Sequence, residues 1–176
     1  EISTSAGQRE INSDWVRGFP DERSGPGASP FSNPSLCKNG DILGHIDPER
    51  PQFYDISADV RDQGDQCRGC RWADHRPWYT SFTTILPPNG PSCGQGGGDN
   101  SKAISSAGSR HQGGAHVLMG DGAVVFITDS IESGDLTAGP AYRLQGGMPY
   151  LGHHEVPGAQ SPYGLWGALG SRANKE

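Results

Sequence analysis

The stretch that decides the fold is 105-SSAGSRHQGGAHVLMGDGAVVFITDS-130, in which two apolar runs flank a tight turn. The first run is Val117–Met119 and the second is Ala123–Ile127. Asp121-Gly122 between them is among the strongest short-range hairpin signals, because a primed turn needs positive φ at its central residues. The β-branched and aromatic residues of the second run favour a strand. The stretch therefore predicts a central β-hairpin.

Composition predicts a mainly β, loop-rich domain. The chain has 176 residues, of which only 32% are hydrophobic, and it contains 27 Gly and 14 Pro. Four Trp, five Tyr and five Phe can still anchor a core, and the charged fraction of 19% is too low to indicate disorder. We therefore expect residues 1–176 to form a single domain built on an antiparallel sheet with long loops.

Other elements are predicted on both sides of the hairpin. One strand is expected around Trp15 and another over Tyr79–Leu86, where β-branched and aromatic residues gather. The glycine-rich stretch 93–101 (CGQGGGDNS) predicts a loop. Near the C-terminus, apolar side chains at helical spacing predict a short helix within 163–173 that packs Trp166 onto the sheet.

The charge and hydropathy of the chain exclude two kinds of partner. The net charge is −6 and no basic stripe is present, so a nucleic-acid partner is not expected. No apolar run reaches the length of a membrane span, and no signal peptide opens the chain. The sequence thus predicts an acidic surface and no membrane span within this chain.

The four cysteines favour structural disulfides. An even count in a Gly- and Pro-rich chain with a modest core is typical of proteins from oxidising compartments. Cys67 and Cys70 form a CxxC pair, for which zinc binding and redox chemistry remain alternatives. Among the connectivities that four cysteines allow, we favour Cys67–Cys70 together with Cys37–Cys93. An extracytoplasmic location follows: cell surface, periplasm or secreted.

An aromatic cluster gives the first candidate binding site. Trp72, Trp78 and Tyr79 lie close together in the sequence beside Asp74, and such a set could stack against a sugar ring. Burial of the same rings in a core-poor domain is the simpler interpretation. A carbohydrate-binding module therefore stays as an alternative function.

The hairpin stretch gives candidate catalytic and metal sites. Ser109, His111 and Asp121 supply the residue types of a hydrolase acting on an ester or a polysaccharide, but no GxSxG elbow is present. His111, His116 and Asp121 could hold a divalent metal ion, although the spacing of the two histidines is odd for one strand. The turn already explains Asp121, so we expect neither a catalytic residue nor a cofactor.

Two further pairs, His45 with Asp47 and His153 with His154, contain residue types that bind metals. His45 and Asp47 lie on a predicted short strand, where a solvated face is the simpler interpretation. His153 and His154 are adjacent and cannot share one helical face. We expect no metal at either pair.

Three motifs in order give the chain a family resemblance. His111 is followed, after nine intervening residues, by Asp121-Gly122, which is an H-x9-DG motif. RWADHRPWYTSFTTILPPNGPSC (71–93) precedes it and SPYGLWGALGSRA (161–173) follows it. With these motifs, the region from about Trp15 to Ala173 resembles the large planctomycete family of prepilin-type proteins of unknown function.

The resemblance implies a structural role. Members of that family resemble type IV pilins and the pseudopilins of type II secretion, in which a cleavage site and a long hydrophobic helix precede a β-rich globular domain. The chain then corresponds to the C-terminal part of an α+β pilin-like globular domain without its N-terminal helix. Other pilin-like subunits or cell-surface polysaccharide are the implied partners. The resemblance assigns no chemistry to the motif residues His111, Asp121 and Gly122.

Overall fold

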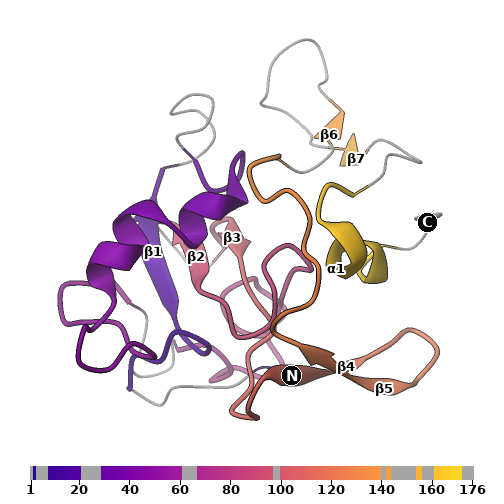
Figure 1. Ribbon diagram of the computed structural model, residues 1–176, viewed down its shortest axis with the longest axis horizontal. Helices are drawn as coiled ribbons and strands as arrows, with labels where there is room; N and C mark the ends of the chain where they lie inside the picture. Colours follow the sequence, from indigo (N-terminus) through magenta and orange to yellow (C-terminus); the bar gives the residue numbers. More distant parts are fainter. Residues whose placement is uncertain are drawn as a thin grey trace.

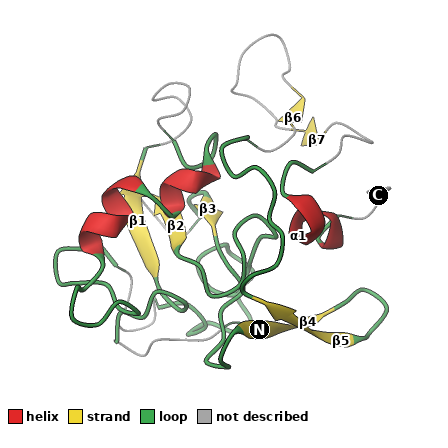
Figure 2. Ribbon diagram, viewed as in Figure 1, coloured by secondary structure: helices red, strands yellow, loops and turns green. Residues whose placement is uncertain are grey.

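The computed structural model describes residues 2, 8–20, 29–60, 67–96, 100–139, 142–143, 154–155 and 161–171. Short strands and long loops dominate the described chain (Figure 2), which confirms the mainly β prediction. The elements in chain order are β1 (Trp15–Phe19), the 3₁₀ helices η2 (Pro34–Cys37) and η3 (Gly40–His45), β2 (Ser92–Gln95), β3 (Ala103–Ile104), β4 (Gly114–Leu118), β5 (Val124–Thr128), β6 (Tyr142–Arg143), β7 (His154–Glu155) and the helix α1 (Gly164–Leu169).

A three-stranded sheet in the order β1-β2-β3 forms the first part of the fold. The strand predicted around Trp15 is confirmed as β1. It runs parallel to β2, and β2 runs antiparallel to β3, so the sheet is mixed. β2 begins at Ser92 and runs into the stretch predicted as a loop. There Gly94 lets the backbone approach Trp78, because a Cβ at Gly94 would lie 3.2 Å from that ring.

The two 3₁₀ helices lie over this sheet (Figure 1) and close its core. The Cys37–Cys93 disulfide joins η2 to β2, with 5.6 Å between the two Cα atoms. Burial of apolar side chains from all these elements holds them together. The buried residues of this cluster are Val16, Phe31, Cys37, Ile42, Tyr54, Ala58, Leu86, Cys93 and Ile104.

The strand predicted over Tyr79–Leu86 is wrong. Tyr79 and Thr80 lie in a turn, and the chain from Ser81 onward is irregular. The Thr80 hydroxyl donates to the Asp74 carbonyl at 2.6 Å, and the Ser81 hydroxyl donates to the His75 carbonyl at 3.0 Å. Such local side-chain bonds compete with a strand ladder, and here they fold the segment back on itself.

The predicted hairpin is confirmed as β4–β5, which extends away from the three-stranded sheet (Figure 1). Its register pairs Gly114 with Thr128 at the base and Leu118 with Val124 near the tip. Gly114 is required at the base, because a Cβ there would lie 2.2 Å from the Ile127 carbonyl oxygen. One face of the hairpin is largely buried, with Val125 on it still 40% exposed, and the other faces outward.

The predicted C-terminal helix is confirmed as α1, and it packs under the buried face of the hairpin. Trp166 is 1% exposed, stacks on Phe82 at a centroid distance of 6.4 Å and donates its Nε1–H to the Leu86 carbonyl at 2.8 Å. The carboxylate of Glu132 accepts the Leu165 backbone N–H at 2.7 Å in the first turn. The buried residues of this second cluster are Ala107, Ala115, Val117, Ile127 and Trp166.

The turn of the hairpin differs from the primed turn that Asp-Gly predicts. Met119 N–H donates to the Ala123 carbonyl at 2.8 Å, and Gly122 N–H donates to the Met119 carbonyl at 3.0 Å. Of the residues between them, only Gly122 has a positive φ, at +89°. This is a three-residue loop that ends in a left-handed residue. Asp121 stabilises it by accepting the Ala123 N–H at 2.9 Å.

The geometry of this turn predicts different effects of substituting its two glycines, Gly120 and Gly122. A Cβ has open space at both Gly120 and Gly122, so only the positive φ of Gly122 distinguishes them. Gly122→Ala is expected to lower the free energy of unfolding by about 1–2 kcal/mol. Gly120→Ala is expected to leave it unchanged or raise it by up to about 1 kcal/mol. Urea unfolding of both variants measures the difference, and equal losses would contradict the turn described here.

Candidate functional site

The H-x9-DG residues are distributed along the hairpin. His111 precedes the base of β4, His116 lies within β4, and Asp121-Gly122 forms the tip. The His111 and His116 rings meet edge to face with centroids 5.0 Å apart, and His116 meets Phe126 of β5 in the same way at 5.1 Å. These contacts are the favoured geometry for aromatic rings, so they orient the start of the motif against the hairpin.

The structure does not bring Ser109, His111 and Asp121 together as a catalytic triad. Ser109 is buried, and its hydroxyl oxygen accepts the backbone N–H of His111 at 3.0 Å. The Ser109 backbone N–H donates to the side-chain oxygen of Asn89 at 2.8 Å. Asp121 lies at the far end of β4, roughly 13 Å along the strand from its base. Ser109 therefore shapes the approach to the hairpin rather than facing a base.

The distance between Asp121 at the tip and the two histidines nearer the base of the hairpin also argues against the alternative metal site. His111 and His116 are in ring contact, whereas the carboxylate of Asp121 is engaged with the backbone at the tip. Within the described ranges, no three His, Cys, Asp or Glu residues are grouped so that they could hold a metal ion. The residues proposed for a divalent metal therefore do not form a ligand set.

His45 and Asp47 do not form a ligand set within the described residues. The carboxylate of Asp47 pairs with Arg50 at 2.8 Å, and that hydrogen-bonded contact holds the pKa of Asp47 below its usual value. His45 turns instead toward a different loop. The side chains of His153 and His154 lie outside the described residues.

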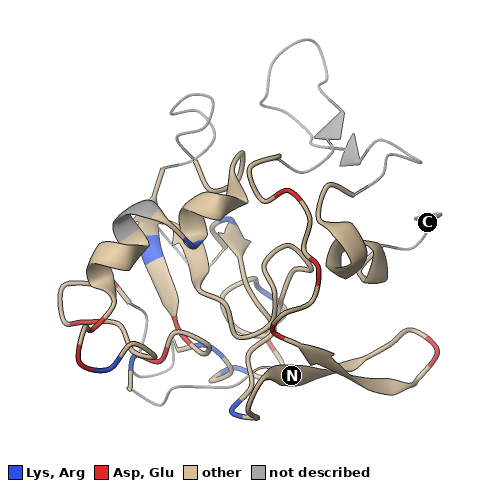
Figure 3. Cartoon of the chain, viewed as in Figure 1, with Lys and Arg blue, Asp and Glu red and all other residues tan. Residues whose placement is uncertain are grey.

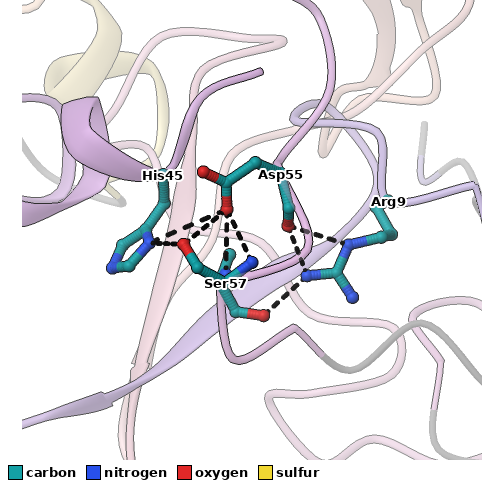
Figure 4. Close-up of polar contacts among 5 residues, drawn as sticks. Arg9, His45, Asp55 and Ser57 are labelled. Carbon is teal, nitrogen blue, oxygen red and sulfur yellow. Dashed lines mark hydrogen bonds and ion pairs between the residues drawn. The ribbon is translucent and has the colours of Figure 1, made fainter.

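His45, Asp55 and Ser57 form a cluster that sequence reasoning missed (Figure 4). His45 Nδ1 lies 2.8 Å from the Ser57 Oγ, and the Ser57 hydroxyl donates to Asp55 Oδ1 at 2.6 Å. Arg9 ties this loop to the N-terminal segment through the carbonyls of Asp55 and Ala58, at 2.7 and 2.6 Å. His45 lies twelve residues before Ser57 in the sequence, and the two meet only because of the fold. No sequence pattern therefore indicated the cluster.

This cluster has the residue types of a triad without its arrangement. The Ser57 hydroxyl lies closer to Asp55 Oδ1, at 2.6 Å, than to His45 Nδ1, at 2.8 Å, so the serine contacts the carboxylate directly and the imidazole does not lie between them as in a triad. Hydrogen bonds from Ser57, first its hydroxyl and then its backbone amide, lower the pKa of Asp55. The cluster is thus a loop-stabilising turn rather than an activated nucleophile.

The rings of the predicted aromatic cluster, Trp72, Trp78 and Tyr79, lie partly in the core and partly at the surface. Trp78 and Tyr79 are 2% and 1% exposed, and Trp78 stacks on Trp15 at 5.4 Å. Trp72 is 85% exposed. Because two of the three rings face inward, they cannot offer a stacking surface to a sugar, and Trp72 is the exposed member of the set.

Asp74 belongs to an ion cluster over the buried Tyr79 ring. Arg76 binds the Asp74 carboxylate through two of its nitrogens, and this contact lowers the pKa of Asp74 to about 2. The guanidinium groups of Arg71 and Arg76 lie over the Tyr79 ring at 4.9 and 5.2 Å. The arrangement satisfies the charge of Asp74 internally and seals the ring from solvent.

The outward face of the hairpin carries several exposed apolar side chains close together. We define the hairpin face as the outward side chains His116, Leu118, Val124 and Phe126, which form two cross-strand pairs. Leu118 is 70% exposed, Val124 65% and Phe126 43%. Figure 3 shows that both strands carry no charged residue, while an acidic residue marks the tip.

A buried cation contacts β1, β2 and the segment that leads into the hairpin, and no sequence signal pointed to it. Arg68, inside the CxxC pair, is 0% exposed, as is Asp14. Burial lowers the pKa of Arg68 to about 10, and the charge of Asp14 opposes that shift. Burial and the charge of Asp14 raise the pKa of Tyr54 above its usual value. Asp14, Tyr54 and Arg68 are thus three buried groups whose charges act on one another.

The comparisons with known proteins place this architecture in a family. Residues 7–134 match the family described as a protein of unknown function (DUF1559). The chain belongs to the DUF1559 family. The matched residues include the three-stranded sheet, both disulfides and the whole hairpin, and they end before α1. No curated protein and no solved structure matches the chain.

In this DUF1559 protein both predicted disulfides are present, Cys37–Cys93 and Cys67–Cys70. Two disulfides are typical of proteins that fold outside the reducing cytosol. No helix among the described residues has both the length and the apolar character needed to cross a bilayer.

Proposed function

We propose that this DUF1559 chain is a non-enzymatic, extracytoplasmic structural protein that joins a pilin-like assembly through the hairpin face. The observation that carries the proposal is the row of outward apolar side chains on β4–β5, on the same hairpin that bears the H-x9-DG motif. The family resemblance supports pilin-like subunits as partners, and the two disulfides support a location at the cell surface, in the periplasm or outside the cell.

The exposed side chains favour an interaction surface. Only 32% of the residues are hydrophobic, yet Leu118, Val124 and Phe126 remain in contact with solvent. Contiguous apolar patches on a protein surface mark sites of protein–protein contact. Burial of each such side chain contributes about 1.5–3 kcal/mol, so even a small patch can drive association.

A second copy of the chain is the occupant that fits this face. Neither β4 nor β5 carries a charge, so two copies can meet there without opposing like charges. In the part of the chain that the structure describes, no third strand joins this two-stranded sheet. Open strand edges beside an apolar face permit strand addition between subunits, as in other β-mediated assemblies.

Sedimentation velocity over a concentration series tests the proposal. The chain is expected to self-associate, and the double variant Leu118→Thr/Val124→Thr is expected to weaken association at least tenfold, because each lost burial is worth about one decade. Ile56→Thr is the matched control, since Ile56 is 96% exposed and lies outside the hairpin. Threonine keeps a β-branched side chain, so the strands are preserved.

A chain that stays monomeric up to millimolar concentration would contradict the proposal. So would equal weakening by the double variant and by Ile56→Thr. Far-ultraviolet circular dichroism of all three proteins shows whether the hairpin variant has kept its fold.

A further inference from the structure

The two disulfides differ in their accessibility. Cys37 and Cys93 are both 0% exposed. Cys70 lies at the surface, whereas its partner Cys67 is buried. A dissolved reductant can therefore reach the Cys67–Cys70 bond from the Cys70 side in the folded protein, while the other bond is shielded.

The residue between these cysteines points in the opposite direction. Arg68 is fully buried, its NH1 lies 3.4 Å from the Ser92 hydroxyl, its NH2 donates to the Ser106 carbonyl, and its guanidinium lies 5.8 Å from the Trp15 ring. Arg68 Nε has no hydrogen-bond partner among the described residues. Burial of a cation with an unsatisfied donor costs free energy, which a constraint on the backbone around Arg68 can offset.

The four-residue ring closed by the disulfide supplies that constraint. Within it Cys70 N–H donates to the Cys67 carbonyl at 3.2 Å, and Gly69 takes a positive φ of +76°. Gly69 N–H also donates to the Tyr79 carbonyl at 2.8 Å, which anchors the ring to the core. The closed ring thus presents Cys70 to solvent and Arg68 to the interior.

Arg68 connects this ring to the segment that leads into the hairpin. Ser106 accepts from Arg68 through its carbonyl and donates its N–H to the Ser92 hydroxyl at 3.1 Å. The neighbouring Ala107 carbonyl accepts from Asn89 N–H at 2.8 Å, and the Asn89 side chain donates to the Gly114 carbonyl of β4 at 3.2 Å. A change at Arg68 is therefore transmitted by direct contacts to residues 105–109.

We propose that Cys67–Cys70 is a thiol–disulfide exchange site for dithiols, and that its opening releases Arg68 from the core and loosens residues 105–109. The inference is independent of the proposed assembly role.

The exchange is a balanced two-electron reduction. A thiolate of the dithiol attacks the Sγ of Cys70, the exposed member of the pair, the Cys67–Cys70 bond breaks, and Cys67 leaves as a thiolate that takes up a proton. The second thiol of the reagent then attacks its own sulfur in the mixed disulfide and releases Cys70. The protein gains two thiols and the dithiol becomes a cyclic disulfide.

The first readout is selective labelling of the whole chain. The oxidised protein is treated with dithiothreitol without denaturant, alkylated at intervals and digested for mass spectrometry. Cys67 and Cys70 are expected to be labelled at least tenfold faster than Cys37 and Cys93. Equal or reversed rates would overturn the exchange site.

The second readout is amide hydrogen exchange on the selectively reduced protein. Exchange is expected to rise at least tenfold at the amides of Gly69 and Ser106, which are bonded in the closed form. The amide of Met119 at the hairpin tip, bonded to the Ala123 carbonyl, is the internal reference. Selective reduction without a rise at Ser106 would overturn the coupling.

A double variant and a control variant complete the test. Cys67→Ser/Cys70→Ser is expected to show the exchange pattern of the reduced protein and no further response to dithiothreitol. Trp72→Ala changes an exposed residue of the same loop and is expected to keep the wild-type response. A double variant that retains slow exchange at the Ser106 amide would also contradict the proposed coupling between the disulfide and residues 105–109.

Discussion

Arg68→Met is expected to lower the free energy of unfolding by about 3–5 kcal/mol, because it removes a buried guanidinium whose positive charge favours the buried carboxylate of Asp14. Arg68 and Asp14 are both fully buried, and the charge of each acts on the other. The variant also removes donors from the Ser106 carbonyl and the Ser92 hydroxyl. Methionine has a similar length and flexibility, so lost packing contributes little.

A double-mutant cycle measured by urea unfolding isolates the charge pair. Arg68→Met/Asp14→Asn is expected to lose less than the sum of the two single changes, by about 1–3 kcal/mol, since the two buried charges that act on each other are removed together. Arg17→Met is the control, because Arg17 pairs with Asp59 at 2.7 Å on the surface and should cost at most about 1 kcal/mol. Equal losses for Arg68→Met and Arg17→Met would contradict the structural role given to Arg68.

Removal of the Cys37–Cys93 disulfide is the other change with a large expected effect. Cys37→Ala/Cys93→Ala is expected to cost about 4 kcal/mol, because the bond closes a loop with a sequence separation of 56 in the unfolded chain. Cys67→Ala/Cys70→Ala is the natural comparison. Its bond spans a separation of only 3 and should cost about 2 kcal/mol on the same chain-entropy argument.

Urea unfolding of the two double variants, both without reductant, measures the two losses of unfolding free energy so that they can be compared. Alanine replaces the half-cystines in each case, so the chemistry of the change is matched. Equal losses would mean that loop length does not determine the contribution of these disulfides. A larger loss for the Cys67–Cys70 variant would mean that this disulfide stabilises the protein mainly by holding Arg68 in the core, and less by restricting the unfolded chain.

The sequence predicted those parts of the fold whose signals are local. The hairpin was predicted because apolar β-formers flank Asp121-Gly122, and α1 was predicted from apolar side chains at helical spacing. Both disulfides were assigned correctly. Even so, the turn type was wrong, because the flanking residues Met119 and Ala123 extend the ladder and leave a three-residue loop.

The failures concern segments whose state depends on distant partners. β-Forming residues predicted a strand over Tyr79–Leu86, but local hydroxyl bonds and the inward position of Tyr79 gave a turn. β2 was predicted as a loop, because glycine has a low strand propensity. It forms there through parallel pairing with β1 and a disulfide to Cys37.

For the candidate site, the sequence by itself determined the hairpin, its H-x9-DG residues and the four cysteines, because backbone propensity and covalent chemistry are properties of short segments. Only the tertiary structure decided which side chains are accessible. It turned Trp78, Tyr79 and Arg68 inward and left Leu118 and Val124 outside. Burial is set by contacts between segments far apart in the chain, and composition and periodicity contain no record of those contacts.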